Sequence, residues 1–306
     1  MQKIPLVTVT CARDLPLLEL QAQSIEQHLT ENSDIYIVVN EDDTVDWQNA
    51  FDKSIRHRYW RHNLKIIYRQ EFDIDWHTWT PSATRNWSMG WEQQQILKLA
   101  VAQKVSCVGY LILDSQNFLI RPWLAQSNVH NQVPYRSGKF VMPLTTWHAY
   151  CGQLGIQESY PTDDTLSICT PIFLHSDLVR SLLQFKGSLN DFAQWFKALK
   201  GKSEFILYLL WAIKNGGLEK YHYRVWDSID GWSGAYLRDS DNFDTDFESF
   251  IKFVGLHKPH AWASINHRSW GDMSNSQYQN TVNKLSEYGL TPDFADYRKH
   301  YLERYR

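Results

Sequence analysis

Residues 108–113 form a run of six residues without charge, and the run ends at Asp114 and the polar sequence Ser-Gln-Asn. Such a run is typical of a strand that is covered on both faces, as strands of a parallel sheet are. Ligands collect at the carboxyl ends of such strands, which places Asp114 at an expected binding edge. The same polar residues also suit a tight turn, because short polar side chains hydrogen-bond the local backbone. The rest of the chain must therefore decide between a turn and a site.

Strand-like and helical patterns alternate along the first 114 residues, and this order predicts an α/β protein with a mostly parallel, doubly wound sheet. The expected strands are 6–10, 35–39, 65–68 and the one ending at Asp114, and the expected helices are 15–29, 47–58 and 91–104. Asp14 is the expected N-cap of the first helix. The second half is less regular: strands are expected near 172–174 and 221–225, and helices near 176–185, 189–199 and 203–214.

Composition narrows the class of protein. The 306 residues are 43% hydrophobic and 21% charged, which fits a globular chain with a substantial core. The net charge of -3 and the lack of a basic stripe argue against nucleic-acid binding. No linker or repeat divides the chain, so we expect one domain, 1–306, with two functional halves.

Several other classes are excluded by missing motifs. The four cysteines lie far apart and form no Cys-x-x-Cys pair. No Walker loop or dinucleotide fingerprint is present. No leader-like apolar region and no stretch of eighteen apolar residues is found, so we expect no integral membrane segment. We expect a reduced, cytoplasmic protein.

Three segments in the first half together resemble the GT-A type of nucleotide-sugar glycosyltransferase, closest to a bacterial branch of little-characterised members. They are residues 8–14, 94–99 (QQILKL) and 110–117 (YLILDSQN). Further on, 203–208 (SEFILY) resembles the family's acceptor-side glutamate motif, and 253–259 (FVGLHKP) is similar to its late Gly-x-x-Lys-Pro element. The resemblance implies a GT-A-like, Rossmann-like fold in which 1–125 bind the nucleotide sugar and 126–306, with C-terminal helices, form the acceptor side. It also implies a part in polysaccharide biosynthesis.

The resemblance implies a set of residues around the donor, near the ends of three strands and on the helix before the fourth. They are Thr10, Arg13, Asp14, Asn40, Gln94, Lys98, Asp114, Ser115, Gln116, Asn117 and Lys258. The cations among them would neutralise the diphosphate. The alternatives are ordinary: a lysine on a helix face is usually solvated, and Arg13 with Asp14 suits a local ion pair.

In this family an Asp-x-Asp pair holds a divalent metal ion that bridges the donor phosphates. Here the second position is Gln116, and a neutral amide is a poorer ligand than a carboxylate for Mn²⁺ or Mg²⁺. Two readings stay open. Asp114 holds a metal together with His257 or His260, or it accepts hydrogen bonds from a ribose.

Sugar transfer with inversion needs a carboxylate that takes the proton of the acceptor hydroxyl, where the acceptor is a glycan or a lipid-linked sugar. Glu204 is the candidate base, and Asp163 or Asp164 is the alternative. A glutamate after Ser203 at a helix start is also a common capping arrangement. A retaining reaction would need no such base.

Two other functions remain. A catalytically inactive, glycan-binding relative is compatible with Gln116 and with the tryptophan-rich loop 73–90. A metal-dependent hydrolase would use His257 and His260 with acids from 227–246, although the chain lacks a His-Glu-x-x-His helix. Nucleotide binding favours the transferase, glycan binding without nucleotide binding favours the inactive relative, and stoichiometric zinc favours the hydrolase.

Overall fold

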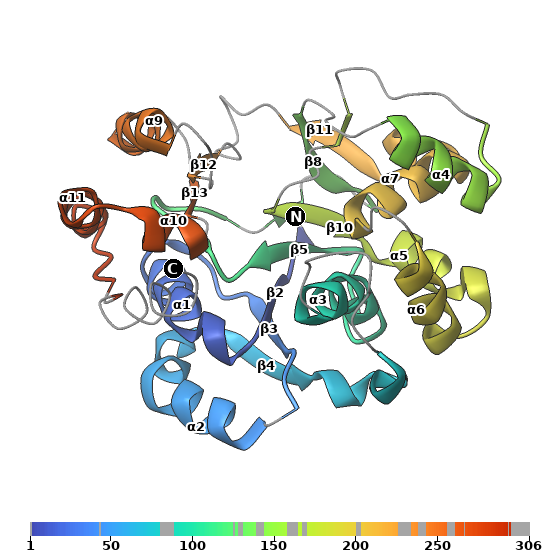
Figure 1. Cartoon of the computed structure of the whole chain (residues 1–306), viewed down its shortest axis with the longest axis horizontal. Helices are drawn as coiled ribbons and strands as arrows, with labels where there is room; N and C mark the ends of the chain where they lie inside the picture. Colours follow the sequence, from blue (N-terminus) through green and yellow to red (C-terminus); the bar gives the residue numbers. More distant parts are fainter. Residues whose placement is uncertain are drawn as a thin grey trace.

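The centre of the protein is a five-stranded sheet in the order β10–β5–β2–β3–β4 (Figure 1). The computed structural model describes residues 2–42, 44–79, 89–124, 126–127, 131–138, 144–157, 165–166, 170–199, 203–225, 234–237, 243–255, 261–265, 267–292 and 294. The strands predicted for the first half are present and run parallel to one another: β2 (Leu6–Thr10), β3 (Asp34–Val39), β4 (Asn63–Tyr68) and β5 (Gly109–Asp114). Strand β10 (Ile172–His175) pairs with β5 in the antiparallel direction. The predicted mixed, mostly parallel α/β sheet is confirmed.

Helices cover both faces of this sheet because strand side chains point alternately to opposite sides. Leu111 and Leu113 of β5 pack on the face covered by α1 (Leu15–His28) and α2 (Thr44–Ser54). Tyr110 and Ile112 pack on the other face. That second face is covered by α3 (Met89–Ala100), α4 (Leu144–Leu154), α5 (Ser176–Leu183), α6 (Leu189–Ala198) and α7 (Glu204–Lys214).

Smaller sheets flank the central one. One of them contains β12 (Gly234–Leu237), β13 (Trp262–Ile265) and β6 (Asn117–Leu119). A second contains β11 (His222–Val225), β8 (Val133–Gly138) and β9 (Thr165–Leu166). The third is the pair of β1 (Gln2–Lys3) and β7 (Gln126–Ser127). Helices α9 (Phe243–Gly255), α10 (His267–Asp272) and α11 (Asn275–Ser286) lie beside β12 and β13 (Figure 1). Within the described ranges, no helix is both long and apolar enough to cross a bilayer.

The structure shifts several predicted boundaries. The helix expected over 47–58 ends at Ser54, and a separate 3-10 turn, η2 (Arg56–Tyr59), follows it. The helix expected over 91–104 is α3 followed by the 3-10 turn η5 (Val101–Gln103). Asp14 occupies the N-cap position of α1 but makes no side-chain capping bond, because its carboxylate faces Arg13 and Cys11. Of the loop expected over 73–90, residues 80–88 lie outside the described residues.

Gly109 begins β5 at a place where there is no room for a side chain. A Cβ there would lie 2.6 Å from the carbonyl oxygen of Leu174 in β10 and would overlap a methyl group of Val133. We expect Gly109→Ala to lower the free energy of unfolding by about 2 kcal/mol, the usual scale of overpacking a core. Urea unfolding measures this change.

Gly152 provides the matched control, because it lies in α4 and a Cβ there would meet nothing within 4 Å. Alanine favours a helix interior over glycine, so Gly152→Ala should leave stability unchanged or raise it by about 0.5–1 kcal/mol. Equal effects of the two substitutions would contradict the close packing of β5 against β10.

Buried His222 in β11 should make stability depend on pH. Its Nε2 atom lies 2.6 Å from the hydroxyl oxygen of Tyr208. Burial, with a contribution from His175, lowers the pKa of His222 to about 3. The neutral ring therefore contributes stability that is fully present above about pH 6.5, the ordinary histidine pKa, and is lost as the pH falls toward 3.

We expect the wild-type protein to lose about 1 kcal/mol more stability between pH 6.5 and 5.5 than His222→Gln loses, because an unfolded histidine is already half protonated at pH 6.5. Urea unfolding of both proteins at pH 6.5 and 5.5 measures the difference. Equal losses of stability in the two proteins would show that the pKa of His222 does not differ between the folded and unfolded states.

Candidate functional site

Asp114 is the last residue of β5, and strand geometry decides which way its side chain points. Tyr110 and Ile112 face α3, and Asp114 follows them with the same period of two. Lys98 comes from the facing helix α3, and its Nζ atom lies 2.8 Å from Asp114 Oδ1. The structure therefore brings together the two residues that the sequence placed at the end of a strand and on the preceding helix.

A second carboxylate holds Lys98 from the other side. Lys98 Nζ lies 3.2 Å from Oε1 of Glu204, the first residue of α7. The side chains of Lys98 and Glu204 are 4% and 2% exposed, whereas that of Asp114 is 26% exposed. Gln95, three residues before Lys98 on α3, lies against the Glu204 carboxylate, where its amide nitrogen is the group that donates. Lys98 therefore pairs with two carboxylates, of which Asp114 is the one partly open to solvent, and we call Asp114, Lys98 and Glu204 the ion triad.

Within the ion triad, Lys98 and Asp114 stabilise each other's charged form. Burial works to lower the pKa of Lys98, but the carboxylates of Asp114 and Glu204 outweigh it and raise that pKa. Burial works to raise the pKa of Asp114, but Lys98 and the Thr170 hydroxyl hold it below the ordinary value. For Glu204 burial prevails over Lys98, so its pKa lies above the ordinary value. Lys98 is therefore a fixed ammonium, and Asp114 is ionised beside it.

Hydrogen bonds fix the open end of the triad. The hydroxyl of Thr170 donates to Asp114 Oδ2 over 2.7 Å. The Asp114 backbone N–H donates to Asn117 Oδ1 over 2.6 Å and closes the turn between β5 and β6. Gln21 of α1 donates from Nε2 to the backbone oxygens of Asp114 and Asn117 over 2.9 and 2.8 Å, and accepts from Thr8. Sequence reasoning missed Thr170 and Gln21. The only available signal for Gln21 was an amide on the apolar stripe of α1.

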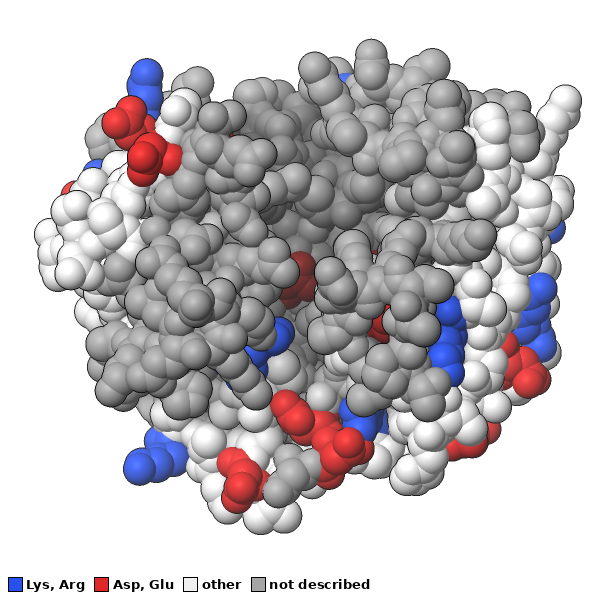
Figure 2. Space-filling model, in the orientation of Figure 1, with Lys and Arg blue, Asp and Glu red and all other residues white. Residues whose placement is uncertain are grey.

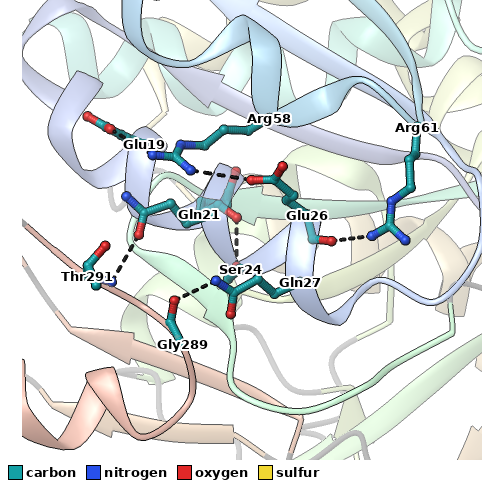
Figure 3. Close-up of polar contacts among 10 residues, drawn as sticks. Glu19, Gln21, Ser24, Glu26, Gln27, Arg58, Arg61, Gly289 and Thr291 are labelled. Atoms are coloured by element: carbon teal, nitrogen blue, oxygen red, sulfur yellow. Dashed lines mark hydrogen bonds and ion pairs between the residues drawn. The ribbon is translucent and has the colours of Figure 1, made fainter.

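Polar contacts with other parts of the chain hold α1, the helix that carries Gln21 (Figure 3). Arg58 lies 3.4 Å from Glu19 and 3.3 Å from Glu26 of α1. Near the end of α1, Gln27 donates to the carbonyl oxygen of Gly289 over 2.5 Å, in the segment after α11. Residues from two distant parts of the chain therefore hold α1 in place.

Other residues that were expected to bind the nucleotide sugar lie close together at the carboxyl edge of the sheet. The Ser115 hydroxyl donates to the Thr10 hydroxyl oxygen over 3.2 Å and connects the ends of β5 and β2. Gln94 of α3 donates from Nε2 to the carbonyl oxygen of Val9 over 3.0 Å. Thr10, Ser115 and Asn117 are buried, so they shape this edge from within.

Asn40, after β3, uses its amide inside the protein. Its Nδ2 donates to the carbonyl oxygen of Gly90 over 2.9 Å, and its Oδ1 accepts from Arg69 over 3.4 Å. The buried Arg69 also donates to Gln93 over 3.0 Å and pairs with Asp42. Arg69 was missed in the sequence, and it connects the ends of β3 and β4 to the start of α3.

A smaller set of side chains at this edge faces solvent. Arg13 is 46% exposed and its Nε lies 3.3 Å from Asp14, so the expected local ion pair is present. Glu41 accepts a hydrogen bond from the backbone N–H of Ala12 over 2.7 Å. Gln116 is half-buried. Figure 2 shows an acidic side chain recessed in a hollow near the middle of this view.

The described residues do not fit a divalent metal ion at Asp114. Both of its carboxylate oxygens already have partners, Lys98 and Thr170, and the position two residues later is the neutral Gln116. In the described ranges, no group of three or more His, Cys, Asp or Glu side chains is placed to hold a metal. The other predicted ligands and acids lie outside the described residues: Asp163, Asp164, His257, Lys258 and His260.

Glycosyltransferases are among the solved structures whose architecture is similar to that of this chain. The galactosyltransferase LgtC, solved with donor and acceptor sugar analogues, matches with a TM-score of 0.53 and 12% identity over 97% of this chain and 99% of LgtC. GlyE of Streptococcus pneumoniae TIGR4 matches with a TM-score of 0.52 and 12% identity over 99% of this chain and 64% of GlyE. At such identities the similarity shows the fold, which is of the GT-A type.

The sequence itself points to one family. No curated protein sequence matches the chain. Residues 1–250 match a family that is described as a family of unknown function, DUF6492. This match spans the central sheet, the ion triad and the helices that carry it, and the chain therefore belongs to the DUF6492 family.

Proposed function

We propose that the chain is a glycosyltransferase, which moves a sugar from a nucleotide-activated donor to a glycan or lipid-linked acceptor. The observation that carries this proposal is the ion triad, an ionised carboxylate opened to solvent at the carboxyl edge of a GT-A-type sheet. Ligands of open α/β sheets bind at this edge. The GT-A fold supports glycosyl transfer as the type of reaction, and the ion triad supports the position of the proposed active site.

In the proposed reaction the acceptor oxygen forms a bond to the anomeric carbon of the sugar. The bond from that carbon to the phosphate oxygen breaks, and the nucleoside diphosphate leaves with the bonding electrons. The acceptor hydroxyl loses its proton to a base or to the leaving phosphate. Arg13 is an exposed cation at this edge and would bind the diphosphate, and the open side of Asp114 would accept hydrogen bonds from ribose or sugar hydroxyls.

We propose that Glu204 positions Lys98, in place of the general-base role expected from the sequence. Its carboxylate is 2% exposed and faces Lys98 and Gln95, which gives an acceptor hydroxyl no direct contact. Glu204→Gln keeps the shape and removes the charge. A positioning role predicts a lower rate with an unchanged pH profile of kcat, whereas loss of the acidic limb of that profile would restore the role of base.

A thermal-shift series tests the proposed function. UDP, GDP, CDP and CMP are added one at a time to the purified chain, with and without Mn²⁺. At ~100 times its Kd, a nucleotide that binds the folded chain adds about 2.7 kcal/mol of stability and raises Tm by several degrees. No shift with any nucleotide would contradict the proposal. A shift with free glycans alone would instead indicate a glycan-binding protein without transferase activity.

A further inference from the structure

We propose that Lys98 is the resident cation of the donor site, so that this chain binds its nucleoside diphosphate without a divalent metal ion. This inference rests on the proposed function. It concerns how that same site balances its charge. The contacts that Lys98 and Asp114 already make carry it.

Lys98 is in direct contact with Asp114. The ammonium lies 2.8 Å from Asp114 Oδ1, which is the distance of a charge-assisted hydrogen bond. A metal ion bound to the same carboxylate would lie a few ångströms from a buried positive charge. Like charges repel strongly at that range where water is excluded, so Lys98 opposes metal binding at Asp114.

Lys98 cannot move away from Asp114 to make room for a metal ion. Glu204 lies 3.2 Å from Nζ on the far side, and the ring of Phe205 is 5.2 Å from Nζ. Moving the ammonium out would leave the buried carboxylate of Glu204 without its counter-charge, which is costly. The ammonium is therefore a permanent part of the site.

The other positions that could bind a metal ion are also unfavourable. Asp114 Oδ2 accepts the hydroxyl of Thr170 over 2.7 Å, which fixes the orientation of the carboxylate. Gln116 stands where a second carboxylate would strengthen a metal site, and its amide carries no charge. Lys98 reduces the negative charge that Asp114 presents, and the entering diphosphate also meets the exposed guanidinium of Arg13.

Titration calorimetry on the wild-type chain tests the inference. UDP, GDP and CDP are titrated separately into protein in EDTA, and again in excess Mn²⁺ or Mg²⁺. We expect the nucleotide that binds to have the same Kd, within about threefold, in both conditions. Tightening of about tenfold or more by either metal would overturn the inference and leave the proposed function standing. Absence of binding in every condition would overturn both.

A double variant tests the role of Lys98 directly. Lys98→Met with Glu204→Gln removes the ammonium and its buried partner charge together, and leaves Asp114 as an uncompensated carboxylate. We expect Mn²⁺ to tighten nucleotide binding by this variant by about tenfold or more, while the Kd of the wild type changes by no more than about threefold.

Lys53→Met, an exposed lysine of α2, is the control and should behave as the wild type. Strong Mn²⁺ binding by the wild type at a site that Asp114→Asn abolishes would overturn the inference. If the double variant does not fold, the wild-type measurements still decide.

Discussion

Replacing Lys98 with methionine is expected to lower the free energy of unfolding by about 3–5 kcal/mol, the usual loss when one partner of a buried ion pair is removed. Methionine fills a similar volume, so the loss comes from charge. Glu204 is 2% exposed and would keep its carboxylate in the protein without a cation. Urea unfolding followed by circular dichroism measures the change.

Two companion variants show whether that loss comes from unpaired charge. Adding Glu204→Gln to Lys98→Met should recover part of the stability, because it removes one of the two carboxylates that lose their pairing with Lys98. Lys53→Met, on the exposed side of α2, should change stability by no more than about 0.5 kcal/mol. A loss below about 1 kcal/mol for Lys98→Met would contradict a buried ammonium held by two carboxylates.

Replacing Asp114 with asparagine is expected to weaken nucleotide binding by about 100-fold, because a hydrogen bond to a charged group contributes ~1.5–3 kcal/mol. Asparagine keeps the size of the side chain and an oxygen that accepts from Lys98, and its amide nitrogen can donate to the Thr170 hydroxyl oxygen, so the fold should be retained. Titration calorimetry with the nucleotide that stabilises the wild type measures the change in Kd.

Asp177→Asn is the matched control for this substitution. Asp177 is 78% exposed on α5, where it pairs with Arg180, and it should bind the nucleotide as the wild type does. Unchanged binding by Asp114→Asn would show that the nucleotide does not contact this carboxylate, whatever the effect of the control.

The sequence predicted the parts of the fold that depend on local patterns. Apolar runs marked β2, β3, β4 and β5, since strands buried on both faces have few charges. Asp114 was placed at the carboxyl end of β5 by the end of its run, and period-two geometry aims it toward α3 and Lys98. The meeting of Asp114 with Lys98 was therefore within reach of sequence reasoning.

The partners that complete the site were not within reach. Thr170 precedes an antiparallel strand 56 residues after Asp114, and Gln21 of α1 is 93 residues before it. Glu204 was found as a carboxylate at a helix start, but its burial against Lys98 depends on how α7 packs on α3. Local patterns carry no information on such long-range packing. Arg69 was missed for the same reason.

The most direct test of the central claim is diffraction from crystals of the chain soaked with a mixture of nucleoside diphosphates. We predict electron density for a nucleotide beside Asp114, with its diphosphate toward Arg13 and no metal ion between the phosphates and the carboxylate. A nucleotide bound away from the carboxyl edge of β2 and β5 would contradict the account.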